Sequence, residues 1–302
     1  MEDSQLSRSG SLNDPSSHAG IYITTFPLKL IIEILSRLPA KSLIRFKSVS
    51  KLWNSIIRSK DLTDAFLTRS RARPRLLFTF QHLETGQSFI FSAPEHEKEK
   101  DKTVVARHEM TITDFGFCTI TSSPYYITSS PVNGLVCCTS GSRIAVCNPT
   151  TRQWCILPHV KPEGRVMHAR LGYDPVGDEY KVLCVMMMCK RGRRDIKQEH
   201  LVFTLRSEQQ LTWRYIDITG EPYTDVQGGI CINGAIYYKV GHTKIARFDI
   251  RRERIMFIEV PKDDITSWVS TNHQGKFGGI EYDDNLYEMM RVWIQEKERF
   301  VE

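Results

Sequence analysis

The chain has 302 residues, of which 41% are hydrophobic, and a formal net charge of +6. This length exceeds one average domain, and the apolar content is ample for a buried core. No stretch approaches the length of a membrane span, and the N-terminus lacks a basic region followed by an apolar run, which excludes a membrane or secreted protein. We therefore expect a soluble intracellular protein, located in the nucleus, the cytoplasm or both.

Residues 1–20 contain six serines and few large apolar side chains. Such a segment cannot repay the entropy of ordering by burial, so we expect a disordered tail.

Residues 21–66 are very apolar, and their pattern predicts three short helices. Pro27 suits the first turn of a helix and Pro39 ends it. Between them, apolar residues at spacings of three, four and seven draw one wide stripe, which comprises Leu30, Ile31, Ile34, Leu35 and Leu38. Ser42 and Ser50 can cap the second and third helices.

About 40 residues rarely build a self-sufficient core without a disulfide, a metal or a second chain. This segment contains no cysteine and no histidine. Its apolar surface therefore predicts cover by a partner protein. The alternative is a helical cap on the chain's own β domain.

The same segment resembles the F-box. The resemblance rests on the Phe-Pro start at 26–27, the run Glu-Ile-Leu-Ser-Arg-Leu-Pro at 33–39, Lys-Ser-Leu at 41–43 and Val-Ser-Lys-Leu-Trp at 49–53. It implies a three-helix module that docks on a Skp-type adaptor and, through the adaptor, on a cullin.

Carried over residue by residue, the resemblance assigns the residues that form or support the adaptor interface. They are Phe26, Pro27, Leu30, Ile34, Leu35, Leu38, Leu43, Val49 and Trp53. One position departs from the F-box pattern, which usually has an acidic residue in the first helical turn, whereas this chain has Leu28 and Lys29. We expect a loss of about 0.3–1 kcal/mol there, because a carboxylate would complement the positive end of the helix dipole.

Residues 67–75 carry alternate arginines and one proline, which is typical of an exposed connector. Beyond it, residues 76–302 show short β-branched and aromatic runs separated by turn residues. These runs cover residues 76–80, 88–91, 135–138, 144–147, 181–185 and 201–205. The fold class is thus α+β and multidomain, with helices first and an all-β domain after them.

An internal repeat runs through the β domain. Asn-Gly-Leu-Val-Cys at 133–137 matches Asn-Gly-Ala-Ile-Tyr at 233–237, and Ile-Ala-Val-Cys-Asn at 144–148 matches Ile-Ala-Arg-Phe-Asp at 245–249. The two matches are offset by about 100 residues. Similar runs at 201–214 and 291–294 reduce the repeat period to about 50 residues, the size of a kelch-type propeller blade. A β-sandwich is the competing fold, because short strands at regular spacing suit it too.

These residues also resemble the plant F-box-associated domain, chiefly at 134–138, 147–154, 171–182 and 213–214. Family proteins usually continue beyond the point where this sequence stops. The run 292–295 resembles a strand whose hairpin partner would lie after Glu302, which would leave the last blade incomplete or closed by the strands near Leu76.

Together the two resemblances imply a substrate-recognition subunit of an SCF-type ubiquitin ligase. The helical module would hold the adaptor, and the β domain would bind a target protein through loops at one rim. Candidate target-binding residues lie in two long polar segments and are Arg165, His168, Arg191 and Arg193. We expect no catalytic residue and no cofactor.

Other functions find less support. No Gly-x-Ser-x-Gly, His-Glu-x-x-His, phosphate-binding or dinucleotide-binding motif is present. The eight cysteines lack two-residue metal spacing, so reduced core thiols are expected rather than a metal site. Basic clusters at 69–75 and 190–194 leave nucleic-acid binding as an alternative, disfavoured because the charge is modest and no DNA or RNA motif is present. A β-propeller interaction module outside any ligase is the other alternative.

Overall fold

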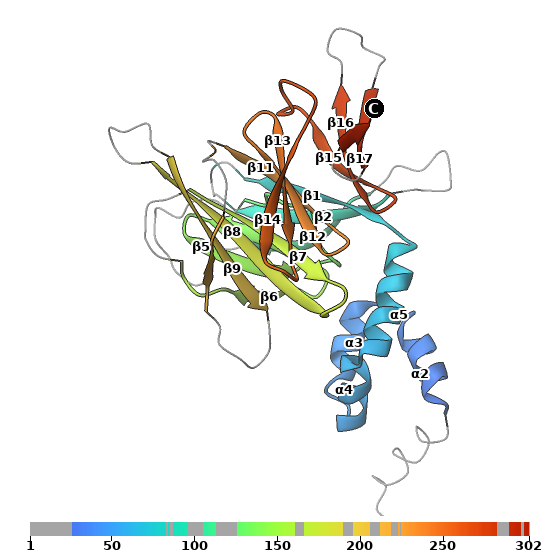
Figure 1. The fold of residues 1–302 in the computed structure, drawn as a ribbon. Helices are drawn as coiled ribbons and strands as arrows, with labels where there is room; N and C mark the ends of the chain where they lie inside the picture. The colour runs from blue at the N-terminus through green and yellow to red at the C-terminus, as the bar shows by residue number, and fades with distance from the viewer. Residues whose placement is uncertain are drawn as a thin grey trace, which may run out of the picture. The chain divides into compact units, whose positions relative to one another are not determined.

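The computed structural model separates the chain into two compact units, Met1–Pro74 and Arg75–Glu302. It describes residues 26–82, 84, 87–95, 105–112, 126–160, 166–189, 196–205, 212–218, 223, 225–282, 290–296 and 299–301. Figure 1 draws the helices in blue and the strands from cyan to red. The expected serine-rich tail at 1–20 lies outside the described residues.

The first unit has four helices within residues 26–74, where the sequence predicted three. They are α2 (Leu28–Leu35), α3 (Ala40–Phe46), α4 (Lys51–Arg58) and α5 (Lys60–Arg71). The fourth begins because Ser59, with an extended ψ of 148°, breaks the helical path, and its hydroxyl accepts a hydrogen bond from the Leu62 amide at 3.3 Å. None of the described helices is long and apolar enough to cross a membrane.

The helix caps agree with the sequence only in part. Ser50 caps α4, since its hydroxyl accepts from the Trp53 amide at 3.2 Å. The cap expected at Ser42 is wrong. α3 begins at Ala40, directly after Pro39, whose φ of −58° and ψ of 141° set the helix start, so Ser42 lies inside the helix.

A small apolar core holds the four helices together. Its buried members come from every helix and are Ile31, Leu35, Leu43, Ile56 and Leu62. Phe46 and Trp53 stack beside it with ring centroids 5.7 Å apart. Because Leu62 belongs to α5, this unit buries its core with a helix that the three-helix expectation lacks.

The expected connector at 67–75 is partly helical, because α5 continues to Arg71. Arg69 forms an ion pair with Glu33 of α2. The run of arginines thus places positive charge at the C-terminal end of a helix, where the helix dipole favours it.

The second unit contains five antiparallel sheets in its described residues. In each sheet the strands hydrogen-bond in chain order. The first two sheets are β1 (Arg75–Gln81), β2 (Ser88–Pro94), β3 (Arg107–Ile112), and β4 (Val136–Ser140), β5 (Arg143–Asn148), β6 (Gln153–Ile156). The third is β7 (Val166–Asp174), β8 (Glu179–Cys189), β9 (Ile196–Leu205), β10 (Arg214–Ile216). The last two are β11 (Val226–Ile232), β12 (Ala235–Val240), β13 (Lys244–Asp249), β14 (Arg254–Glu259), and β15 (Val269–His273), β16 (Lys276–Tyr282), β17 (Met290–Glu296), β18 (Arg299–Val301).

Four apolar cores lie between successive sheets along the chain. Strand β8 shows how one strand supplies two of them: Val182 and Cys184 enter the core shared with the preceding sheet, while Leu183 and Val185 enter the core shared with the next. This alternation follows from the two-residue period of a strand. Five separate sheets replace the two that a β-sandwich would have.

The repeat seen in the sequence has a structural counterpart in two hairpin turns. Asn133 and Gly134 have φ values of 49° and 80°, and Asn233 and Gly234 have 47° and 78°. Two successive positive φ angles favour Asn-Gly, as in the tight hairpin turns that match the twist of β-strands. The runs 144–148 and 245–249 that follow become the equivalent strands β5 and β13.

The expectation that the partner of run 292–295 lies beyond Glu302 is wrong. Strand β17 pairs with β18, placing Ile294 opposite Val301. Strand β18 is only three residues long, so the sequence pattern missed this partner.

Candidate functional site

The helical unit exposes a set of large apolar side chains that its core does not use. They are 44–62% exposed and form what we call the apolar face: Phe26, Leu28, Leu30, Ile34, Val49 and Leu52. Six large exposed apolar side chains on so small a unit are typical of a protein that binds another protein there.

Helix α2 supplies both the core and the apolar face. Ile31 and Leu35 point inward and are buried, whereas Leu30 and Ile34 are exposed. The apolar stripe predicted from the sequence is therefore wider than one small core can cover. One half of it packs within the unit, and the other half is open to contact with another protein.

The structure separates the nine residues assigned to the adaptor interface into three groups. Five are exposed: Phe26, Pro27, Leu30, Ile34 and Val49. Two, Leu35 and Leu43, are buried in the core, and two, Leu38 and Trp53, are half-buried against it. Leu35 and Leu43 are placed to support a docking surface from behind, whereas Leu38 and Trp53 keep part of their surface open.

Two members of the apolar face, Leu28 and Leu52, were not among the residues assigned from the sequence. Leu28 was noted only as a departure from the acidic pattern, and Leu52 only as part of the F-box-like run at 49–53. Their exposed fractions are 53% and 44%. Because several arrangements of short helices satisfy the same apolar pattern, the sequence could not tell which of these side chains face outward.

One carboxylate of the helical unit, Glu33, pairs with two arginines. Glu33 accepts from Arg37 at 2.6 Å and forms an ion pair with Arg69 of α5. Hydrogen bonds from Arg69 and then from Arg37 hold the pKa of Glu33 below its ordinary value. The first turn of α2 has no acidic residue, and Pro27 offers no side-chain cap. The departure from the F-box pattern thus leaves the positive end of this helix uncompensated.

Of the four candidate target-binding residues in the β unit, the structure describes one, His168. Arg165, Arg191 and Arg193 lie outside the described residues. His168 lies in strand β7, opposite Val185, rather than in a loop. Burial and the nearby charge of Arg170 lower the pKa of His168 to about 4, so this half-buried ring is neutral at physiological pH.

A buried guanidinium lies beside His168, and no sequence pattern indicated it. Arg170 is fully buried, its Nε donates to the Gly228 carbonyl at 2.6 Å, and its guanidinium lies 4.5 Å from the centre of the Tyr238 ring. No carboxylate forms an ion pair with it in the described part of the chain. Burial lowers the pKa of Arg170, and burial together with Arg170 lowers that of His200 to about 4. Arg170 is thus a buried cation with neutral neighbours, which is unusual in proteins.

A cavity of about 430 Å³ opens near this guanidinium. Its walls come from β1, from residues 127–131 before β4, from residues 227–229 of β11, from Lys239 of β12 and from residues 268–270 at β15. Its volume is that of a small-molecule site. The sequence could not have indicated it, because five segments far apart in the chain contribute to it.

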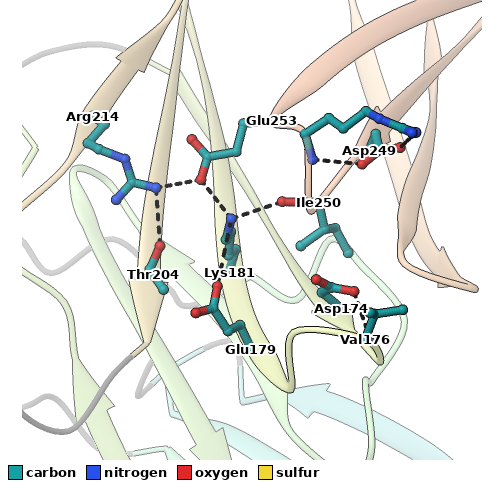
Figure 2. Close-up of polar contacts among 10 residues, drawn as sticks. Asp174, Val176, Glu179, Lys181, Thr204, Arg214, Asp249, Ile250 and Glu253 are labelled. Carbon is teal, nitrogen blue, oxygen red and sulfur yellow. Dashed lines mark hydrogen bonds and ion pairs between the residues drawn. The ribbon is translucent and has the colours of Figure 1, made fainter.

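A charged cluster elsewhere in the β unit is structural. Lys181 of β8 donates to Glu253 at 2.7 Å and to the Ile250 carbonyl at 3.0 Å, and Arg214 donates to the same Glu253 oxygen at 2.5 Å (Figure 2). Glu253 and Ile250 lie in the turn between β13 and β14. The cluster therefore fastens the third sheet to the fourth, and its charges are paired with one another.

The arginines and cysteines singled out in the sequence have ordinary structural surroundings where they are described. Arg69 pairs with Glu33, and Arg75 donates to the Ser92 hydroxyl at 2.9 Å, which leaves the cluster at 69–75 less free for phosphate than its composition suggests.

Four cysteines are free and buried, as expected for core thiols: Cys137, Cys138, Cys147 and Cys184. Cys155 differs, being free and exposed. In the part of the chain that the structure describes, no three His, Cys, Asp or Glu residues are placed to hold a metal ion.

Comparison with known families matches both units. A family model for the F-box domain matches residues 23–64, and one for the F-box associated beta propeller domain matches residues 75–300.

Two similar proteins are F-box proteins of Arabidopsis thaliana. At1g30790 is 34% identical over 296 residues, which cover 91% of this chain and 72% of the relative. At3g49450 is 35% identical over 300 residues, covering 93% of this chain and 70% of the relative. Among solved structures, the crystal structure of Porphyromonas gingivalis dipeptidyl peptidase 4 aligns with a TM-score of 0.39 and 6% identity over 74% of this chain and 36% of that chain.

Proposed function

Because the chain belongs to the family of F-box proteins with an F-box-associated β domain, we propose that it is the substrate receptor of a cullin-based SCF ubiquitin ligase. F-box proteins are generally substrate adaptors rather than enzymes. In this role the chain holds a target protein near a ubiquitin-conjugating enzyme. The rate of transfer rises through proximity, and the receptor supplies no nucleophile.

The observation that carries this proposal is the apolar face of the helical unit. Its six members are about half exposed, and fully burying a large apolar side chain contributes about 1.5–3 kcal/mol. Covering the remaining half of each side chain corresponds to about 1 kcal/mol apiece. A Skp-type adaptor with a complementary apolar groove is the partner that we assign to this surface, with Leu30 and Ile34 of α2 as the principal anchors.

We further propose that the five sheets are blades of a propeller that presents the target-binding surface. Each sheet is a meander, and each pair of successive sheets shares a core. Those are the features of blades that cannot bury their faces alone. Side chains from the first and last sheets, Leu77 and Val269, line the same cavity, as expected if the ends of the series approach each other.

Co-purification with a plant Skp-type adaptor tests the proposal. The full chain should retain the adaptor, and the double change Leu30→Asp, Ile34→Asp should abolish association, because both side chains are exposed and dispensable for the core. The matched control is Val176→Asp, an apolar-to-acid change at a residue that is 69% exposed in the β unit. The control should bind the adaptor like the wild type.

Two results would overturn the docking assignment. One is undiminished adaptor binding by the double variant. The other is a full chain that is folded, as judged by circular dichroism, and yet does not associate with any adaptor offered. The second result would favour the alternative hypothesis, in which the helical unit is a cap on an interaction module outside the ligase.

A further inference from the structure

The cavity near Arg170 has a polar end with an unusual balance of groups. The described residues that line it include five hydroxyl side chains and the ammonium group of Lys239, but no carboxylate. Hydroxyl groups donate and accept hydrogen bonds, an ammonium group only donates them, and an anionic acceptor forms the stronger bonds with both kinds of donor.

Lys239 is held at the cavity by the backbone. It is 8% exposed, and its Nζ donates to the carbonyls of Thr266 at 2.6 Å and Trp268 at 3.1 Å. An ammonium group has three hydrogens, so one remains for a ligand. The carboxylates that act on Lys239 electrostatically are Asp225 and Asp264, and neither lines the cavity.

Ser129 supplies the second element of the polar end. Ser129 lines the cavity, and its Oγ is buried and has no hydrogen-bond partner in the described part of the chain. A buried hydroxyl without a partner costs free energy in the folded protein, so its retention at a cavity wall points to a partner that the chain itself does not provide.

The third element is the positive charge of Arg170 behind the cavity wall. Its Nε donates to the carbonyl of Gly228, and a Cβ at Gly229 would come within 2.9 Å of its Cδ. Both glycines line the cavity. Arg170 therefore fixes this part of the wall, and one of its terminal nitrogens, Nη2, has no partner among the described residues. Two cations lie close to the cavity, and only neutral side chains line the rest of it.

The wall also contains apolar residues, among them Leu77, Ile127 and Trp268. We propose that this cavity is a binding site for an anionic group, carboxylate or phosphate, carried on a small apolar or aromatic body. Such a group can belong to a free metabolite-sized molecule or to a side chain of the bound target. The site belongs to the β unit alone, so failure of adaptor docking would leave it untouched.

Isothermal titration calorimetry on the full chain tests the site. Phenyl phosphate is the charged probe, benzyl alcohol is its neutral counterpart, and a pentapeptide of four glycines around one phosphotyrosine represents a target side chain. We expect phenyl phosphate to bind at least about tenfold more tightly than benzyl alcohol, because hydrogen bonds to a charged acceptor are the stronger ones.

Three variants locate the binding. Ser129→Ala should lose about tenfold in affinity for phenyl phosphate, while the melting temperature stays unchanged or rises, because its buried hydroxyl makes no bond within the described protein. Lys239→Gln should lose more. Ser142→Ala is the control, since its hydroxyl contacts His159 and does not line the cavity.

The outcomes are decisive in either direction. Phosphopeptide binding that is tighter than that of phenyl phosphate supports the site and indicates a target side chain, whereas equal or weaker binding of the peptide supports the site and indicates a free small molecule. The proposal is overturned if neither phosphate probe binds, if the neutral probe binds as well as the charged one, or if Ser129→Ala binds like the wild type.

Discussion

Replacing Lys181 with methionine should destabilise the β unit by about 2–4 kcal/mol. The Lys181 side chain is 8% exposed, and the change removes its hydrogen bonds to Glu253 at 2.7 Å and to the Ile250 carbonyl at 3.0 Å (Figure 2). A hydrogen bond to a charged group contributes about 1.5–3 kcal/mol. The loss should lie below the sum of two such bonds, because Glu253 is 22% exposed and retains Arg214.

Urea titration of the full chain, followed by circular dichroism of the sheets, measures this loss. The matched control is Lys276→Met, which breaks a 2.6 Å ion pair with Glu296 whose members are 51% and 56% exposed. We expect the control to cost less than about 1 kcal/mol, as exposed pairs do. Combining Lys181→Met with Glu253→Gln should cost less than the sum of the two single changes, because each single change already removes the attraction between the two charges.

A cost for Lys181→Met within about 0.5 kcal/mol of the control would refute the argument that this cluster fastens the third sheet to the fourth. Strict additivity in the double variant would refute direct coupling of the two side chains.

Glu253→Gln should also reduce the loss of stability in acid. Burial raises the pKa of Glu253, but Lys181 and Arg214 outweigh burial and hold the pKa below the ordinary 4.5. The ionised Glu253 therefore stabilises the wild type at neutral pH, and this stabilisation is lost as the pH falls through the lowered pKa. Urea midpoints at neutral pH and at about pH 3 should therefore differ less in the variant, and an unchanged difference would contradict the assignment. Ser50→Ala should cost the helical unit about 1 kcal/mol through loss of the α4 cap, whereas Ser48→Ala, whose hydroxyl only donates to a carbonyl, should cost less; equal melting temperatures of the two variants would argue against the cap. Gly279→Ala places a Cβ 2.0 Å from the Trp268 ring and should lower stability by about 1–3 kcal/mol in a thermal melt, and a variant as stable as the wild type would show that the ring can move aside.

Signals carried by neighbouring residues predicted much of the fold. The Asn-Gly pairs at 133–134 and 233–234 specify the same turn wherever they occur, and all six runs named as strands are strands. Helix α5 escaped notice because Leu62 and Phe66 are too few to draw an apolar stripe across Lys60–Arg71. Its stability comes from packing against the other helices rather than from its own pattern.

The candidate sites were less accessible to sequence reasoning, for a physical reason. The motif around Ile34 identified the segment, but the division of its stripe between core and surface depends on where the other helices pack. The cavity at Ser129 and Lys239 depends on pairing and stacking over more than a hundred residues, and no local pattern records that arrangement.

Every described sheet is made of consecutive strands, and every core in the β unit joins sheets that follow one another in the chain. Most contacts that a new strand needs are therefore with residues synthesised shortly before it. Such a unit has a low contact order for an all-β protein and can fold sheet by sheet as it leaves the ribosome. The cavity, which needs β1 and β15 together, is completed only after residues 268–270 have been synthesised, so a ligand for it can recognise only a chain in which these distant strands have come together.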